Sequence, residues 1–260
     1  MINSLQFKQG NAPKVIPLLT IKVCFGADSN IRFDCPYIVR IEQKEKTETF
    51  FFLGKKDERT GKQMKAFLIL EDGNVFTGTS IGSTREVISE IVFNTSMTGY
   101  LEVLTDPSYA GQAVVMTYPL IGNYGITPDM ESKKPWPDGY IVRELSRMPS
   151  NFRCEGTIQD FLTKNDIPGI AGIDTLTKIL REKGTMNGMI TTNENYNIEE
   201  IIPKLKAYTT GNVVDKVTCE EKRVLSGAGK RVALMDFGAK NNIAQSLNNR
   251  GCEVTIYPAH

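Results

Sequence analysis

The central part of the chain alternates apolar and polar positions in the manner of short strands. One apolar run, KAFLIL, begins directly after Met64, and a second, VFTGTSIG, follows the turn EDGN. Asp-Gly between two apolar runs is typical of a tight hairpin, because the turn needs positive φ at the glycine. We therefore predict a β-hairpin here and a domain that begins at Met64.

The runs that follow are short and are interrupted by turn residues. EIVFNTSMTGYLEVLTDPSYAGQAVVMTYPLIGNYG is predicted to form strands joined by turns at Thr-Gly, Asp-Pro-Ser and Gly-Asn. DGYIVREL is predicted to form one more strand.

From about Thr157 onward, helical and strand-like segments alternate. GTIQDFLTKND has helical spacing with Thr157 as a possible N-cap, and DTLTKILREKG is a helix with Asp174 at its start and Gly184 at its end. NIEEIIPKLKAY is a further helix, which Pro203 is expected to interrupt, while IPGIAGI and MNGMITT read as strands. This alternation favours a partly parallel sheet in a mixed α/β fold.

The two ends of the chain differ from this pattern. Residues 1–63 hold possible strands in PKVIPLLTIKVCF and CPYIVRIEQ and then become highly charged, so we treat them as an unassigned N-terminal extension. Residues 208–229 are polar and are expected to be a linker with one short strand. Residues 230–260 read as a strand, a turn, an amphipathic helix and a second strand.

Composition and charge exclude several classes of protein. The net charge of +1 gives no electrostatic reason to expect a nucleic acid or an anionic membrane as partner. No apolar run approaches the roughly 18 residues that span a bilayer, and the N-terminus lacks a signal pattern. The five cysteines are scattered without C-x-x-C spacing, so we expect reduced thiols, no metal site and a cytoplasmic location.

The residues that usually carry nucleophilic catalysis are poorly placed. The only histidine is His260, the last residue, which is an unfavourable position for a general base. Cys154 and Cys219 adjoin glutamates, which are expected to raise the pKa of each thiol, and Cys252 reads as a structural thiol. DFGAKNN has one glycine after a strand, so it is interpreted as a turn rather than a phosphate loop.

A polar cluster in FNTSMTGYLEVLTDPSYAGQ supports two interpretations. Its side chains are common turn formers, and they are also the groups that hydrogen-bond small polar ligands. The cluster consists of Thr95, Ser96, Thr98, Thr105, Asp106 and Ser108.

Several of these segments together resemble a known family. ILEDGNVFTG, EIVFNTSMTGYLEVLTDPSYAGQ, TYPLIGNYG, GIAGIDT, LREKG and DFGAKNNI occur in this order from Met64 to His260. They resemble the small subunit of glutamine-dependent carbamoyl-phosphate synthetase, and residues 1–63 match nothing in that family.

The resemblance implies a fold and an activity. It implies a swivelling β/β/α domain at residues 64–207, and the first β-α-β unit of a flavodoxin-like class I glutamine amidotransferase domain at residues 230–260. The family's small subunit hydrolyses glutamine with a cysteine, a histidine and a glutamate, and passes ammonia to a large subunit. That subunit binds ATP and Mg²⁺ and makes carbamoyl phosphate from bicarbonate for pyrimidine and arginine synthesis.

The resemblance also assigns one site residue and reveals two departures. A serine in the family's DPSY motif, here Ser108, contacts the bound glutamine. The catalytic triad of the family would lie beyond His260, so we expect a chain that is truncated early in the amidotransferase domain, binds no cofactor itself and does not hydrolyse glutamine alone. The family usually has IDTRxLT before REKG, so two residues are missing near Asp174, which would shift a helix face by about 200°.

Two alternatives remain at this point. The chain could be a non-catalytic module that docks on the large subunit, or a truncated product without function.

Overall fold

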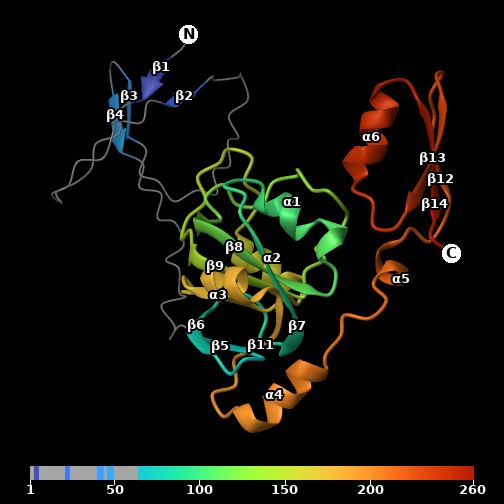
Figure 1. Cartoon of the computed structure of the whole chain (residues 1–260). Helices are drawn as coiled ribbons and strands as arrows, with labels where there is room; N and C mark the ends of the chain where they lie inside the picture. The colour runs from blue at the N-terminus through green and yellow to red at the C-terminus, as the bar shows by residue number, and fades with distance from the viewer. Residues whose placement is uncertain (1–2, 6–20, 24–39, 44–45, 50–63) are drawn as a thin grey trace. The chain divides into compact units, whose positions relative to one another are not determined.

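The structure, a computed structural model, describes residues 3–5, 21–23, 40–43, 46–49 and 64–260 (Figure 1). The chain divides into two compact units, Met1–Lys62 and Gln63–His260.

The N-terminal unit contains two pairs of short antiparallel strands. β2 and β3 lie within the two apolar segments that predicted strands, so the prediction is confirmed at those positions. The remainder of residues 1–63 lies outside the described residues. The pairs are β1 (Asn3–Leu5) with β2 (Ile21–Val23), and β3 (Arg40–Gln43) with β4 (Lys46–Thr49).

The second unit begins with the predicted hairpin. β5 (Lys65–Leu70) and β6 (Val75–Ser80) pair antiparallel across a turn in which Gly73 has a φ of 88°. The Asn74 amide donates to Asp72 Oδ1 over 3.0 Å and closes the turn. The prediction from Asp-Gly is therefore confirmed.

Seven strands form one sheet that closes on itself. The order is β10-β6-β5-β11-β7-β8-β9, and β10 also pairs with β9. The pairs β7–β8, β8–β9 and β10–β9 are parallel and the others antiparallel, which confirms the predicted mixed α/β class with a partly parallel sheet. The strands after the hairpin are β7 (Val87–Asn94), β8 (Gln112–Ile121), β9 (Gly139–Leu145), β10 (Gly169–Ala171) and β11 (Met186–Thr191).

Helices pack against both faces of this sheet. Successive residues of a strand point to opposite faces, so one strand contributes side chains to both of these contacts. Ala113 and Val115 of β8 belong to a core that α3 completes, whereas Val114 and Met116 pack with α1 and α2. A smaller core joins α4 to β5, β7 and β11. The helices are α1 (Tyr100–Leu104), α2 (Ile158–Lys164), α3 (Leu176–Lys183) and α4 (Ile198–Ala207).

The predicted ends of α2 and α3 are mostly confirmed. The Thr157 hydroxyl oxygen accepts from the Asp160 amide over 3.1 Å and caps α2. Gly184 ends α3 with a φ of 89°. The predicted start is wrong by one residue, since Thr175 rather than Asp174 occupies the N-cap position, and its side chain makes no capping bond.

The prediction of strands and turns alone in residues 90–125 is wrong in one place. Residues Tyr100–Leu104 form helix α1, although Tyr and Val favour strands locally. A distant side chain explains the difference, because Tyr124 Oη accepts from the amides of Gly99 and Tyr100 at the start of α1. Four of the five α1 residues are buried, so tertiary packing outweighs local propensity.

The predicted interruption at Pro203 is also wrong, because α4 continues through that residue. Proline removes one helical hydrogen bond. Burial of Ile201 and Leu205 against Ile69 of β5 offsets this loss, and Asn197 caps the helix through the Glu199 amide.

The C-terminal part forms the predicted strand–helix–strand unit. Its sheet has the order β12-β14-β13, with β13 and β14 parallel. α6 packs on one face of this sheet through Ala244 and Leu247, against Val254 and Ile256. Residues 208–229 contain the one predicted short strand and also a short helix that was not predicted. The elements are α5 (Val214–Val217), β12 (Arg223–Leu225), β13 (Arg231–Asp236), α6 (Asn241–Asn249) and β14 (Glu253–Pro258).

Within the described residues, no helix is both long enough and apolar enough to cross a membrane.

Candidate functional site

The DPSY segment forms a short 3₁₀ turn that presents Ser108 to solvent. The turn spans Pro107–Tyr109, and Pro107 suits its first position because proline lacks an N–H. Asp106 Oδ1 accepts from the Ser108 amide over 2.9 Å. The Ser108 side chain is exposed, and its hydroxyl makes no hydrogen bond within residues 64–260. The hydroxyl is therefore free to bind a ligand.

Thr105, the residue before this turn, has a structural role. It is fully buried, its hydroxyl donates to the Leu101 carbonyl over 2.8 Å, and the same oxygen accepts from the Glu131 amide over 2.9 Å. Ser132 Oγ donates to the Thr105 carbonyl over 2.6 Å. These bonds join the end of α1 to the loop at 131–132 and fix the position from which the Ser108 turn begins.

Asp106 also holds a residue from the C-terminal part of the chain. Lys240 Nζ lies 2.8 Å from Asp106 Oδ2, and the Asp106 side chain is only 8% exposed. The hydrogen bond to Asp106 raises the pKa of Lys240. One carboxylate thus fixes both the Ser108 turn and the segment before α6.

The DFGAK segment is a turn built on a second aspartate. Asp236 Oδ1 accepts from the amides of Gly238 and Ala239 over 3.0 and 2.8 Å, and Oδ2 accepts from the Cys219 amide over 2.9 Å. These two turn amides already have an acceptor, so they are not available to bind a phosphate. The interpretation as a turn rather than a phosphate loop is confirmed.

Gly238 lets this turn approach the Ser108 turn closely. Its φ is +96°, and a Cβ at this position would lie 3.2 Å from Pro107 Cβ and 2.9 Å from Val217 Cγ2. A larger residue would meet both side chains and strain the backbone. The structure therefore places DPSY and DFGAK, which are far apart in sequence, against each other.

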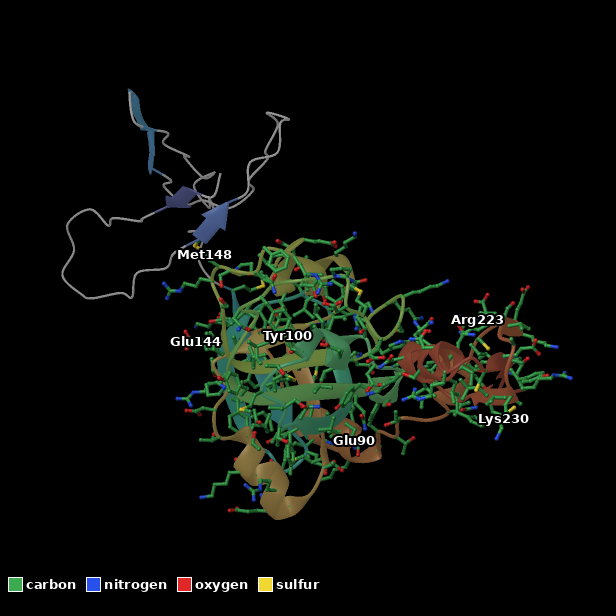
Figure 2. The ribbon with its side chains drawn as sticks, turned by 90° about the horizontal axis from the view of Figure 1, so that it is seen from above. Glu90, Tyr100, Glu144, Met148, Arg223 and Lys230 are labelled. Atoms are coloured by element: carbon green, nitrogen blue, oxygen red, sulfur yellow. The ribbon has the colours of Figure 1, made fainter. Side chains whose placement is uncertain are left out.

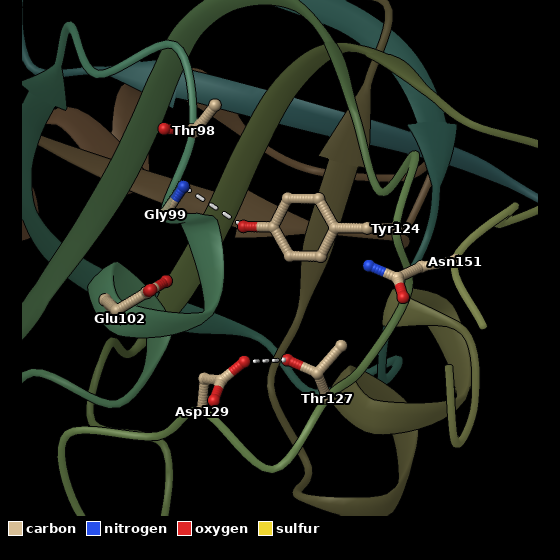
Figure 3. A pocket seen from close by; sticks show the side chains of 7 residues that line it. All are labelled: Thr98, Gly99, Glu102, Tyr124, Thr127, Asp129 and Asn151. Carbon is tan, nitrogen blue, oxygen red and sulfur yellow. Dashed lines mark hydrogen bonds between the residues drawn. The ribbon is translucent and has the colours of Figure 1, made fainter. Parts of the chain in front are cut away.

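The other members of the predicted polar cluster lie apart from Ser108. Thr95, Ser96 and Thr98 are exposed in the segment between β7 and α1, where Asn94 Oδ1 accepts from the Ser96 amide. Thr98 lines a separate open hollow of about 290 Å³. Figure 3 shows the side chains of this hollow, which are Thr98, Gly99, Glu102, Tyr124, Thr127, Asp129 and Asn151.

Sequence reasoning named Thr98 in its polar cluster but missed Lys240 and the other residues of this hollow. Lys240 belongs to the DFGAK motif, but only its distance from Asp106 reveals a role for it. Tyr124 and Asn151 carry no local signal, because their positions depend on contacts across the fold.

No hydrogen bond joins His260 to Cys154, Cys219 or Cys252, the cysteines that lie within residues 64–260. Burial and a hydrogen bond to Asp236 raise the pKa of the Cys219 thiol. For Cys219 the predicted direction is confirmed, but the causes are burial first and then Asp236, rather than the adjacent glutamates. Cys252 is partly buried beside the α6 core, which fits a structural thiol. Residues 64–260 and the four short strands contain no group of His, Cys, Asp or Glu side chains that could hold a metal ion.

Comparisons with known proteins give a consistent result. Residues 68–190 match the family model "Carbamoyl-phosphate synthase small chain, CPSase domain". The chain is 54% identical over 198 residues to the carbamoyl phosphate synthase small chain of Clostridium perfringens, covering 75% of this chain and 56% of the relative. It is 48% identical over 201 residues to the pyrimidine-specific small chain of Halalkalibacterium halodurans, covering 76% and 55%.

A third relative, the small chain of Listeria monocytogenes, is 48% identical over 198 residues, covering 75% of this chain and 54% of the relative. The chain thus spans about half the length of the curated relatives it matches. The resemblance seen in the sequence is confirmed, and through its CPSase domain the chain belongs to the carbamoyl-phosphate synthase small-chain family.

Proposed function

We propose that this chain supplies one side of the glutamine site in the small chain of a glutamine-hydrolysing carbamoyl-phosphate synthase. The small chain releases ammonia from glutamine, and a large chain uses ATP and Mg²⁺ to join it to bicarbonate. We place this activity in the cytoplasm, in pyrimidine or arginine synthesis. The family membership supports the proposal, and one relative is named a pyrimidine-specific small chain.

The observation that carries the proposal is the presentation of Ser108. Its amide is bound by Asp106 and its hydroxyl is exposed, so the side chain can donate to or accept from a small polar ligand. Glutamine carries a carboxylate, an ammonium group and an amide, each of which a serine hydroxyl can bind. The resemblance assigns this role to the serine of DPSY.

The Asp106–Lys240 pair supports the same proposal from the other side of the site. It joins the Ser108 turn to the segment that leads into α6, over a distance of 2.8 Å. A shared glutamine site requires that the two halves keep a fixed separation, because catalysis is sensitive to displacements of about 1 Å. We propose that the pair positions Ser108 toward the part of the small chain that bears the catalytic residues.

We further propose that residues 1–260 do not hydrolyse glutamine by themselves. The sequence has one histidine, and within residues 64–260 no hydrogen bond joins His260 to Cys154, Cys219 or Cys252. Ammonia release from glutamine by the purified chain tests this directly. Turnover clearly above a blank without protein would contradict the proposal.

The role of Ser108 requires a protein with the complete active site. We suggest a fusion of residues 1–260 to the part of the Clostridium perfringens relative that follows its matched region. Ser108→Ala should raise the KM for glutamine roughly tenfold or more, as expected for loss of a hydrogen bond to a charged group. Ser96→Ala is the matched control, because Ser96 is an exposed turn serine outside the site, and its KM should not change.

A further inference from the structure

Two consecutive residues, Thr105 and Asp106, connect the end of α1 to the beginning of α6 by different routes. The first route is the ion pair of Asp106 with Lys240. The second route passes through Glu131 and uses only neutral hydrogen bonds. The Glu131 amide donates to the Thr105 hydroxyl over 2.9 Å, and the Glu131 carbonyl accepts from the Asn241 amide over 3.1 Å. We call this second route the neutral bridge.

The beginning of α6 depends on the neutral bridge, because the N-cap residue of this helix does not cap it. Lys240 occupies the N-cap position, and its side chain makes no capping hydrogen bond. The first N–H groups of a helix have no partner within the helix. Asn241 is the first residue of α6, and its N–H donates across the fold to the Glu131 carbonyl. This bond fixes the start of α6 relative to the loop at Glu131.

Thr105 holds the other end of the neutral bridge in rigid surroundings. The residue is fully buried, and its hydroxyl donates to the Leu101 carbonyl over 2.8 Å. Since the single hydroxyl proton is used in that bond, the oxygen acts toward Glu131 as an acceptor. Tyr100, the first residue of the same helix, lies among the packed side chains next to the closed sheet (Figure 2). The bridge therefore starts from a well-packed part of the fold.

The loop that contains Glu131 is tied to the end of α1 at two further places. Ser132 Oγ donates to the Thr105 carbonyl over 2.6 Å, and Trp136 Nε1 donates to Ser132 Oγ over 2.8 Å. The Trp136 amide donates to the Leu104 carbonyl over 3.0 Å. A displacement of this loop would strain several bonds to α1 at once. The neutral bridge thus resists a change in the separation between α1 and α6.

We infer that Thr105 is a positioning residue of the glutamine site, and this inference rests on the proposed function. A fully buried hydroxyl cannot reach a ligand, so Thr105 acts through other groups. Through the neutral bridge it sets the separation between the Ser108 turn and α6, in parallel with the ion pair of Asp106. The two routes differ in chemistry. Salt weakens an ion pair with an exposed partner, whereas it has little effect on neutral hydrogen bonds.

The first test uses the full chain and requires no activity. Hydrogen exchange measured by NMR reports whether the Asn241 amide stays bound. Thr105→Val removes the hydroxyl and keeps the branched shape, so it should speed exchange of the Asn241 amide roughly fivefold or more. Thr105→Ser keeps the hydroxyl and should preserve the slow exchange. Thr163→Val is the matched control, because the Thr163 hydroxyl also donates within its helix, to the Gln159 carbonyl over 2.8 Å, but lies outside the bridge.

The second test breaks the neutral bridge at its other end. Asn241→Pro removes the N–H that donates to Glu131, and proline suits the first position of a helix. The preceding residue, Lys240, has a ψ of 137°, which is compatible with a following proline. Asn241→Ala keeps the N–H and therefore isolates the contribution of the side chain.

Both substitutions are also measured in the fusion that carries the complete active site. Asn241→Pro and Thr105→Val should each raise the KM for glutamine roughly fivefold, with kcat changed by less than about twofold. Thr105→Ser should restore the KM, and Asn241→Pro should exceed Asn241→Ala. The increase should persist at high salt, because the bridge is neutral. Thermal unfolding of each variant checks that it remains folded.

The outcomes separate this inference from the proposed function. If Ser108→Ala raises the KM but Thr105→Val and Asn241→Pro do not, the inference is wrong and the proposed function stands. Unchanged exchange of the Asn241 amide in Thr105→Val would also overturn the inference. A fusion that does not hydrolyse glutamine would overturn both. If Thr105→Val does not fold, Asn241→Pro decides alone, since Asn241 is exposed.

Discussion

Lys240 Nζ lies 2.8 Å from Asp106 Oδ2, and this ion pair joins the turn that presents Ser108 to the segment before α6. Asp106 is almost fully buried, whereas the Lys240 side chain is 43% exposed. The two partners therefore differ in burial and in the role they play. The aspartate organises the Ser108 turn and the lysine neutralises it.

We expect Asp106→Ala to lower the free energy of unfolding by about 1–3 kcal/mol, because it removes the cap of the Ser108 turn and leaves Lys240 unpaired. Lys240→Met should have a smaller effect, since lysine retains solvent contact. Urea unfolding of both single variants and the double variant gives the coupling, expected near 1 kcal/mol. Strictly additive effects would show that the two side chains do not interact in solution.

The same pair predicts a pH dependence. The hydrogen bond to Asp106 raises the pKa of Lys240 above its ordinary value of 10.5. A group whose pKa is raised by folding stabilises the protein below its unfolded-state pKa, and this contribution is lost as pH rises through the folded-state pKa. The stability difference between the unsubstituted chain and Lys240→Met should therefore be constant up to about pH 10 and shrink above it. Chemical unfolding between pH 7 and 11.5 measures this, and a difference that grows with pH would contradict it.

Two buried tyrosines make a contrasting pair. Tyr140 Oη is buried and has no hydrogen-bond partner, whereas Tyr100 Oη donates to the Gly125 carbonyl over 2.8 Å. Tyr140→Phe should therefore leave stability unchanged or raise it by up to about 1 kcal/mol, because it removes an unpaired polar group. Tyr100→Phe should cost about 1 kcal/mol. Thermal unfolding of the two variants provides the comparison, and equal losses would show that Tyr140 has a partner after all.

These tyrosines also predict sensitivity to alkali. Burial raises the pKa of Tyr100, Tyr124 and Tyr140 above the ordinary value of 10.0. The unfolded chain then releases these protons at lower pH than the folded chain, so stability falls as pH rises above about 10. Tyr140→Phe should reduce the slope of this loss. An unchanged slope in chemical unfolding at pH 10–11.5 would mean that Tyr140 does not contribute.

Gly238 offers a test of the close approach between the two turns. Gly238→Ala introduces a Cβ that meets Pro107 and Val217 and forces positive φ on a residue with a side chain, so we expect a loss of about 2 kcal/mol or more. Gly211→Ala is the control. Gly211 also has positive φ, but a Cβ there meets nothing within 4 Å. Its loss should be about 1 kcal/mol, and the excess in Gly238→Ala measures the packing between the turns.

Much of the secondary structure could be predicted, since its signals are local. Asp-Gly fixes the β5–β6 hairpin, Thr157 fixes the start of α2 and Gly184 fixes the end of α3. Helix α1 could not be predicted, because Tyr124 caps it from a distance. The continuity of α4 through Pro203 depends in the same way on tertiary burial of the residues around it.

The candidate site likewise has features that the sequence predicted and features that only the structure revealed. The resemblance in the DPSY block predicted that Ser108 contacts glutamine. The single glycine in DFGAK predicted a turn. Neither showed that the two segments meet or that Asp106 pairs with Lys240.

The sequence by itself determined the family, the mixed α/β class and the strand–helix–strand unit at residues 230–260. It could do so because residue spacing and turn chemistry act over a few neighbouring positions. Only the tertiary structure decided the closure of the seven-stranded sheet, the start of α1 and the contact between the two turns. These depend on contacts between residues far apart in the chain, such as those of β10 with β6 and of Asp106 with Lys240, which no local pattern encodes.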